Sequence, residues 1–312
     1  MRPSAFITSS YRFQHLSDQR VENLKFQLEE YAHVHRLRGL CLVGREGVNL
    51  TVSSESESGR EEFKSELKQW LGGIALSFRD ATARKHPFRV FKVKIKDEIV
   101  TLGRPGWIPE AKTERHLSPE AWHEALHAPD TVVIDTRNDY EVAIGKFKNA
   151  VDLKLSEFRE FPQALRQSGI DKNKKVLIYC TGGIRCEKAI LEMQDQGFEQ
   201  VYQLDGGILN YLSQYPQAEF EGECFVFDYR VAVDQTLQPT THYRLCPHCG
   251  HPANRPLECM KCGSHAVICQ RCQESAVHAC SKNCAHHARI GSRSRKPHLP
   301  ELRQKQGVKR PV

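Results

Sequence analysis

Apolar and polar positions in the first hundred residues change their period several times, which predicts strands alternating with helices. Two amphipathic helices are expected, one over residues 18–35 with Asp18 as its N-cap and one over residues 58–71. Strands are expected at residues 5–13, 40–43, 48–52, 74–78 and 88–95. The order β-α-β-β-α-β is that of a ferredoxin-like domain, which we place at residues 1–96.

A second alternation begins after residues 97–116, a linker in which glycine and proline recur. Ser118-Pro119-Glu120 opens a helix, and further helices are expected at residues 184–194 and 208–215. Apolar runs predict buried strands at residues 131–134, 175–179 and 201–204. Strands that alternate with helices predict a parallel α/β sheet covered on both faces, with functional sites at the carboxyl ends of its strands. We place this domain at residues 117–220.

A thiol follows one of these buried strands directly. Cys180 is succeeded by the loop Thr181, Gly182, Gly183 and Ile184, and Arg185 then opens a helix. Consecutive backbone N–H groups in such a loop bind an anion, and the helix N-terminus adds positive potential at the same place. Both effects favour the thiolate form, so Cys180 is the candidate nucleophile.

The neighbours of Cys180 allow more than one role. Arg185 either orients the loop or contacts an anionic substrate. Asp135 and Arg137, at the end of the neighbouring strand, are expected to brace the loop, the alternative being that they act on substrate. Cys186 is either a packed thiol or a resolving partner for an oxidised or persulfidated Cys180.

The loop has two other possible interpretations. A Cys-x5-Arg phosphatase would need arginine at position 186, where this chain has Cys186. The loop is therefore one residue short for phosphate and favours sulfur or another compact group. The structural alternative is that Cys180 is an inert core thiol.

The cysteine pattern predicts metal sites near the C-terminus. Eight of the twelve cysteines form four closely spaced pairs: Cys246 and Cys249, Cys259 and Cys262, Cys269 and Cys272, Cys280 and Cys284. Eight thiolates match two tetrahedral structural zinc sites, which we assign to a zinc-binding module at residues 221–288. The spacing leaves the pairing open, and a nearby histidine could replace a cysteine: His248, His251, His265, His278, His286 or His287. A catalytic zinc and an iron–sulfur cluster are the alternatives.

The start of the chain has no apolar segment of the secretory kind, and no apolar run is long enough to span a membrane. We therefore expect a cytoplasmic protein without disulfides. The net charge of +7 resides entirely in residues 289–312, since the rest of the chain has equal numbers of basic and acidic residues. Such a basic tail either binds a polyanion such as nucleic acid or is simply solvated.

Three segments of the second domain resemble the rhodanese family. They are residues 133–150 with VIDTRNDYE and GKFKNA, the active loop, and residues 204–208 with LDGGI. The arrangement of the whole chain is very similar to the tRNA uridine(34) hydroxylase family. That resemblance rests on residues 44–49 (GREGVN), residues 179–189 (YCTGGIRCEKA), residues 225–228 (FVFD) and the cysteine pairs.

The resemblance implies oxygen-dependent formation of 5-hydroxyuridine at the wobble position of tRNA, with Cys180 as an essential persulfide site. On this interpretation Arg185 and Lys188 could meet the anticodon backbone. The turn at residues 44–49 would contact RNA or the rhodanese domain, or would be only a hairpin turn. The sequence shows no flavin, haem or non-haem iron motif, and zinc is redox-inert. The alternatives are a rhodanese-type sulfurtransferase served by a sulfur donor or reductant protein, and a non-catalytic binding module.

Overall fold

The computed structural model describes residues 5–110, 113–275 and 278–290. The chain forms two compact units, one ending at Leu245 and the other beginning at Cys246. The basic tail expected at residues 289–312 lies outside the described residues except for its first two positions. None of the described helices is long and apolar enough to cross a membrane.

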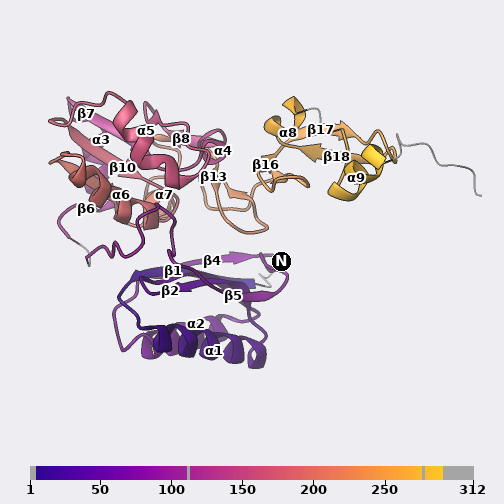
Figure 1. Ribbon diagram of the computed structural model, residues 1–312, viewed down its shortest axis with the longest axis horizontal. Coiled ribbons are helices and arrows are strands. Elements are labelled where there is room, and N and C mark those ends of the chain that lie inside the picture. The colour runs from indigo at the N-terminus through magenta and orange to yellow at the C-terminus, as the bar shows by residue number, and fades with distance from the viewer. Residues whose placement is uncertain (1–4, 111–112, 276–277, 291–312) are drawn as a thin grey trace, which may run out of the picture. The chain divides into compact units, whose positions relative to one another are not determined.

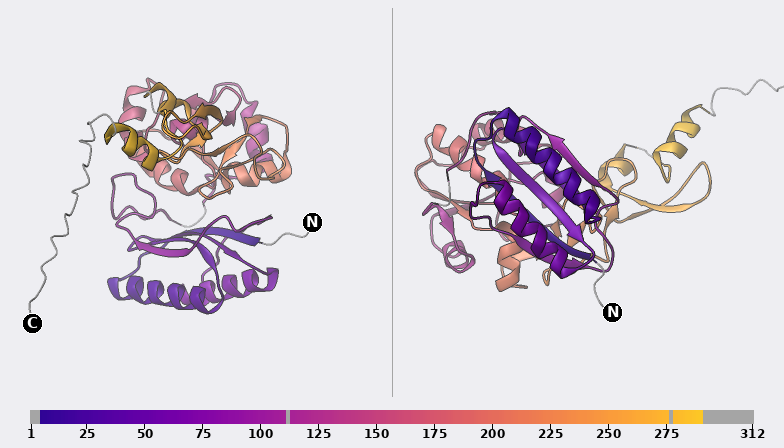
Figure 2. Two further views of the ribbon diagram at one scale, coloured as in Figure 1. Left: turned by 90° about the vertical axis from the view of Figure 1, so that its right-hand side faces the viewer. Right: turned by 90° about the horizontal axis from the view of Figure 1, so that it is seen from below.

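The first unit opens with a five-stranded sheet in the order β4-β1-β3-β2-β5. Its strands are β1 (Ala5–Phe13), β2 (Arg38–Gly44), β3 (Gly47–Ser54), β4 (Arg79–Ala83) and β5 (Phe91–Ile95). Helices α1 (Asp18–Val34) and α2 (Glu57–Trp70) both cover the same face of this sheet (Figures 1 and 2). The order of the first four strands, with β1 antiparallel to both β3 and β4, confirms the ferredoxin-like arrangement, and β5 adds a parallel edge strand beside β2.

Two local predictions in this domain are wrong. The strand expected at residues 74–78 is displaced, because Leu76 and Phe78 pack against the helix-covered core as irregular chain and the pairing with β1 begins only at Arg79. The N-cap of α1 is Ser17 rather than Asp18, since the Ser17 side chain accepts the hydrogen bond from the backbone N–H of Arg20.

The second sheet of the first unit is parallel throughout, in the order β6-β11-β10-β7-β9. The strands are β6 (His116–Leu117), β7 (Thr131–Asp135), β9 (Val151–Asp152), β10 (Lys175–Tyr179) and β11 (Val201–Leu204). The helical segments are α3 (Pro119–Leu126), α4 (Asp139–Val142), η1 (Phe158–Glu160), α5 (Phe161–Gln167), α6 (Ile184–Asp195) and α7 (Gly207–Gln214). Successive residues of β10 enter different cores. Val176 and Ile178 join the core with α5 and α6, while Leu177 and Tyr179 join the core with α3 and α7. A sheet covered on both faces, as predicted, is confirmed.

The chain after α7 first stays with this sheet domain. Strand β12 (Phe220–Gly222) pairs with β8 (Gly145–Phe147), and β13 (Cys224–Phe225) pairs with β14 (Ala232–Val233). After β15 (Arg244–Leu245) comes the second unit. It contains β16 (Pro252–Ala253), the hairpin of β17 (Arg255–Glu258) and β18 (His265–Ile268), and helices α8 (Gln270–Glu274) and α9 (Lys282–Ile290). None of the twelve cysteines, all of which lie in the described residues, is joined in a disulfide.

Candidate active site and metal centres

The loop that holds Cys180 is tightly constrained between β10 and α6. Cys180 is only 1% exposed, and the backbone N–H of Gly183 donates a hydrogen bond to its Sγ over 3.0 Å. Gly183 is the N-cap of α6 and has φ +97°, a conformation in which a side chain is strained. A Cβ at this position would also lie 2.9 Å from the Tyr11 hydroxyl oxygen. Glycine is therefore required here both by the backbone and by the space available.

The surroundings of Cys180 favour its thiolate. Burial alone would raise the pKa of the thiol. The hydrogen bond with Cys186, the positive charge of Arg185 and the backbone N–H groups of Arg185 and Gly182 outweigh burial and lower the pKa to about 5. Burial and the neighbouring Cys180 raise the pKa of Cys186 well above its ordinary value. Of the two thiols, Cys180 is thus the one that ionises at neutral pH.

Arg185 is held by a carboxylate that the sequence analysis did not single out. Its two terminal nitrogens lie 2.6 and 2.8 Å from the two carboxylate oxygens of Glu141, a bidentate ion pair with both partners buried. Burial opposes ionisation of Glu141, but Arg185 holds its pKa below the ordinary value. The hydroxyl of Thr181 also donates to Glu141, over 3.3 Å. Glu141 thereby ties α4 to both ends of the active loop.

Asp135 and Arg137 form a second buried ion pair beside the first. The Arg137 guanidinium makes bidentate contact with the Asp135 carboxylate, with a shortest distance of 2.6 Å, and donates to the Gly145 carbonyl. Thr136, between them, donates to the Tyr179 carbonyl and lies 3.7 Å from Cys186 Sγ. The structure therefore brings Asp135, Arg137, Cys186 and the loop of Cys180 together at the carboxyl ends of β7 and β10.

Lys188 does not lie where the sequence suggested. Its ammonium is fully buried, and Nζ lies 2.7 Å from a carboxylate oxygen of Glu46 and 2.7 Å from one of Glu98. Glu46 also accepts a hydrogen bond from the Ile99 backbone N–H over 2.6 Å. The expectation that Lys188 faces an RNA backbone is wrong, because its ammonium is buried between two carboxylates. For Arg185 the same expectation stays a prediction, since its guanidinium is paired with Glu141 but lines a cavity. The turn at residues 44–49 instead contacts the rhodanese domain through Glu46.

A cavity of about 350 Å³ opens onto Cys180. One wall is the helix-free face of the first sheet, with Tyr11, Leu40 and Leu42, and another is the active loop. The segment after α7 contributes Phe227, Asp228 and Arg230. Tyr11 also donates a hydrogen bond to Glu187 on α6 over 2.8 Å. The ferredoxin-like domain therefore completes the cavity that Cys180 lines.

The lowered pKa predicts the pH dependence of Cys180 alkylation. Reaction with iodoacetamide follows the thiolate fraction, so its rate should rise about tenfold per unit up to about pH 5 and be nearly flat between pH 6 and 8. Mass spectrometry of the Cys180 peptide measures this rate. Cys224, whose pKa is raised by burial to about 12, serves as the internal control and should not react in this range. A Cys180 midpoint near pH 9 would contradict the assigned electrostatics.

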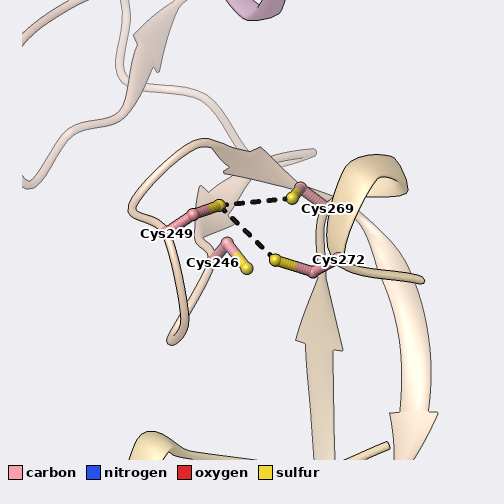
Figure 3. A group of neighbouring side chains, drawn as sticks. All are labelled: Cys246, Cys249, Cys269 and Cys272. Carbon is pink, nitrogen blue, oxygen red and sulfur yellow. Dashed lines mark hydrogen bonds between the residues drawn. The ribbon is translucent and has the colours of Figure 1, made fainter. Parts of the chain in front are cut away.

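The four cysteine pairs of the second unit converge into two groups. Cys246, Cys249, Cys269 and Cys272 form one group (Figure 3), and Cys259, Cys262, Cys280 and Cys284 form the other. Along the chain, the first and third cysteine pairs form one group and the second and fourth form the other. The spacing alone had left this combination open. Among the residues that the structure describes, both groups consist of cysteine alone, so none of the described histidines replaces a thiol in either.

The sulfur geometry fits a single tetrahedral ion in each group. Neighbouring sulfur atoms lie 3.4 and 3.7 Å apart in the first group and 3.6, 3.6 and 3.8 Å apart in the second. Zinc–sulfur bonds of about 2.3 Å place tetrahedral ligands about 3.8 Å apart. Both groups could therefore hold a metal ion, and the residues are compatible with zinc.

The fold and the loop define a rhodanese-domain protein with an added ferredoxin-like domain and cysteine clusters. Family comparison agrees, matching a UPF0176 acylphosphatase-like domain over residues 5–99, a rhodanese-like domain over residues 118–214 and a rhodanese C-terminal region over residues 221–285. The tRNA uridine(34) hydroxylase of Bdellovibrio bacteriovorus is 46% identical over 310 residues, covering 97% of this chain and 88% of its own length. That of Synechocystis is 44% identical, covering 79% of this chain and 88% of its own. The chain belongs to the tRNA uridine(34) hydroxylase family.

Among solved structures, the rhodanese-like domain of an Anabaena protein is 19% identical with a TM-score of 0.30, covering 35% of this chain and 80% of its own.

Proposed function

We propose that this protein is a cytoplasmic tRNA uridine(34) 5-hydroxylase. The observation that carries the proposal is the 46% identity, over 97% of this chain, to a protein of that name. The site supports it chemically, because an activated thiolate lies at the wall of a cavity closed by two domains. An extruded base can enter a pocket of this kind, as enzymes that modify nucleobases require.

In the proposed reaction the C5–H bond of the wobble uridine becomes C5–OH. Molecular oxygen is the co-substrate. One oxygen atom enters the base, and the other leaves as water after taking two protons and two electrons from two thiols of a reductant protein, which become a disulfide. Cys180 is the essential group, either as thiolate or as a persulfide. The persulfide forms when the Cys180 thiolate takes the outer sulfur of a persulfide on a sulfur-donor protein, which leaves as a thiol. The loop N–H groups hold either anion.

The other predicted residues act by holding Cys180 in place. Arg185, paired with Glu141, supplies the positive charge that favours the Cys180 anion. Asp135 and Arg137 fix the neighbouring strand end, and Cys186 donates a hydrogen bond to the thiolate. Thr181, Gly182, Gly183 and Ile184 form the cradle itself.

The two cysteine groups of the second unit hold structural zinc in this proposal. The ion would supply folding free energy rather than redox chemistry, because zinc has no accessible second oxidation state. The described residues of that unit bury few apolar side chains besides cysteines, which leaves metal as its main source of stability.

The test is nucleoside mass spectrometry of tRNA from a host that lacks its own enzyme and is supplied with this chain. Restored 5-hydroxyuridine supports the proposal. The alternative is a rhodanese-type sulfurtransferase, favoured only by the persulfide-sized cradle around Cys180. Absence of the nucleoside together with rapid thiosulfate:cyanide turnover would replace the hydroxylase with that alternative.

A further inference from the structure

An exposed aromatic ring stands at the mouth of the Cys180 cavity. Phe227 lines the cavity, yet it is 57% exposed. Phe225 packs edge-on against it with ring centres 5.0 Å apart, and the Arg185 guanidinium lies 5.6 Å from its ring centre. A large apolar ring held in solvent beside a reactive cavity offers a flat surface on which a nucleobase can stack.

Basic residues gather in one stretch of the first domain. Residues 79–96 contain seven basic side chains against a single acid, Asp80, although the chain before residue 289 is neutral as a whole. The seven are Arg79, Arg84, Lys85, Arg89, Lys92, Lys94 and Lys96. The excess of basic residues at 79–96 does not show in the net charge, because acidic residues elsewhere before residue 289 offset it.

Strand β5 directs two of these lysines to the cavity side of the first sheet. Phe91 packs against the helix-covered core, so Lys92 and Lys94, which alternate with it in orientation, lie on the opposite face. In the register with β2, Leu40 is opposite Lys92 and Leu42 is opposite Lys94. Both leucines line the cavity, so the lysines continue its wall towards the open edge of the sheet.

These lysines are available to bind a ligand. Lys92 and Lys94 are both exposed, as is Lys96 beyond the end of the strand. Within the part of the chain that the structure describes, none of the three has an acidic partner at ion-pair distance. Phosphates repeated along a strand are the anions that such a row of lysines binds best.

We propose that Phe227 and the lysines of β5 form the surface on which single-stranded RNA docks at the Cys180 cavity. A base of the RNA loop stacks on Phe227, while Lys92 and Lys94 contact the phosphates of the nucleotides next to that base. The inference that RNA is the ligand rests on the proposed function. The new element is the set of residues that would select a single-stranded RNA loop.

The test is binding of an anticodon stem-loop RNA with uridine at the wobble position, compared with a blunt duplex of the same stem. The Phe227→Ala variant should weaken stem-loop binding about tenfold or more and leave the duplex unaffected, and Phe227→Trp should restore binding. The Lys92→Ala/Lys94→Ala variant should weaken binding and reduce the slope of log Kd against log salt concentration by about 1.4. The charge-matched control is Lys68→Ala/Lys172→Ala, whose lysines are exposed elsewhere, and it should bind like the unaltered chain.

Unchanged binding in the Phe227→Ala and lysine variants would overturn the proposal, as would equal losses in the control. An unaltered thermal transition and circular dichroism spectrum show that each variant remains folded. RNA binding is measured without turnover, so the outcome of this test does not depend on whether the protein forms 5-hydroxyuridine. If the variants behave as expected but no 5-hydroxyuridine is formed, the docking surface stands and the hydroxylase assignment fails.

Discussion

The Cys180→Ser variant is expected to form no measurable 5-hydroxyuridine in tRNA, a loss on the order of a thousandfold or more. Serine preserves the size of the side chain, so the loop and its neighbours keep their packing. It cannot form a persulfide, and its hydroxyl stays protonated where the Cys180 thiol, with a pKa of about 5, is ionised. Nucleoside mass spectrometry of tRNA from complemented cells measures the effect.

The matched control for this variant is Cys41→Ala. Cys41 is a buried thiol of the first sheet whose pKa is raised by burial, and it does not line the cavity. Its replacement should leave 5-hydroxyuridine at the wild-type level. Wild-type activity in Cys180→Ser would remove the thiol from the mechanism.

Removal of metal is expected to unfold the second unit while the first remains intact. The chain should contain about two zinc ions, and structural zinc of this type contributes on the order of 10–16 kcal/mol to folding. A chelator added with a thiol-binding mercurial should abolish protease resistance of residues 246–290. Tryptophan fluorescence should not change, because all three tryptophans, Trp70, Trp107 and Trp122, lie in the first unit.

Single substitutions separate the two metal groups. Cys246→Ser should lower the metal content to about one ion per chain, and so should Cys259→Ser, because each belongs to a different group. Cys41→Ala should retain both ions. Elemental analysis decides the matter, and iron in place of zinc, or no metal at all, would contradict the assignment.

Local patterns were enough to predict the strand, loop and helix around Cys180. An apolar run, a cysteine, two glycines and a helix start are adjacent in sequence, and β10, the loop and α6 follow them closely. The alternation of strands and helices along the second domain was likewise enough to predict a parallel sheet with a core on each face. The prediction of a strand at residues 74–78 was wrong because the spacing of apolar residues indicates burial. It does not distinguish a paired strand from irregular chain packed on a core.

Contacts between distant residues could not be predicted in this way. Glu141 is 44 positions from Arg185, and Glu46 is 142 positions from Lys188, so neither ion pair leaves a signal in local spacing. The cysteine pairs were recognisable, but their interleaving depends on how the β17–β18 hairpin folds. The basic stretch at residues 79–96 did leave a signal, which the neutral total of the chain concealed.

The roles of the individual site residues and the domain boundaries remain predictions.

The most direct test of the central claim is position-resolved mass spectrometry of tRNA from cells that lack their own enzyme, carry this chain and are grown under oxygen-18 gas. The account predicts one oxygen-18 atom in 5-hydroxyuridine at position 34 and at no other uridine. An unmodified or thiolated position 34, or a hydroxyl without the label, would contradict it.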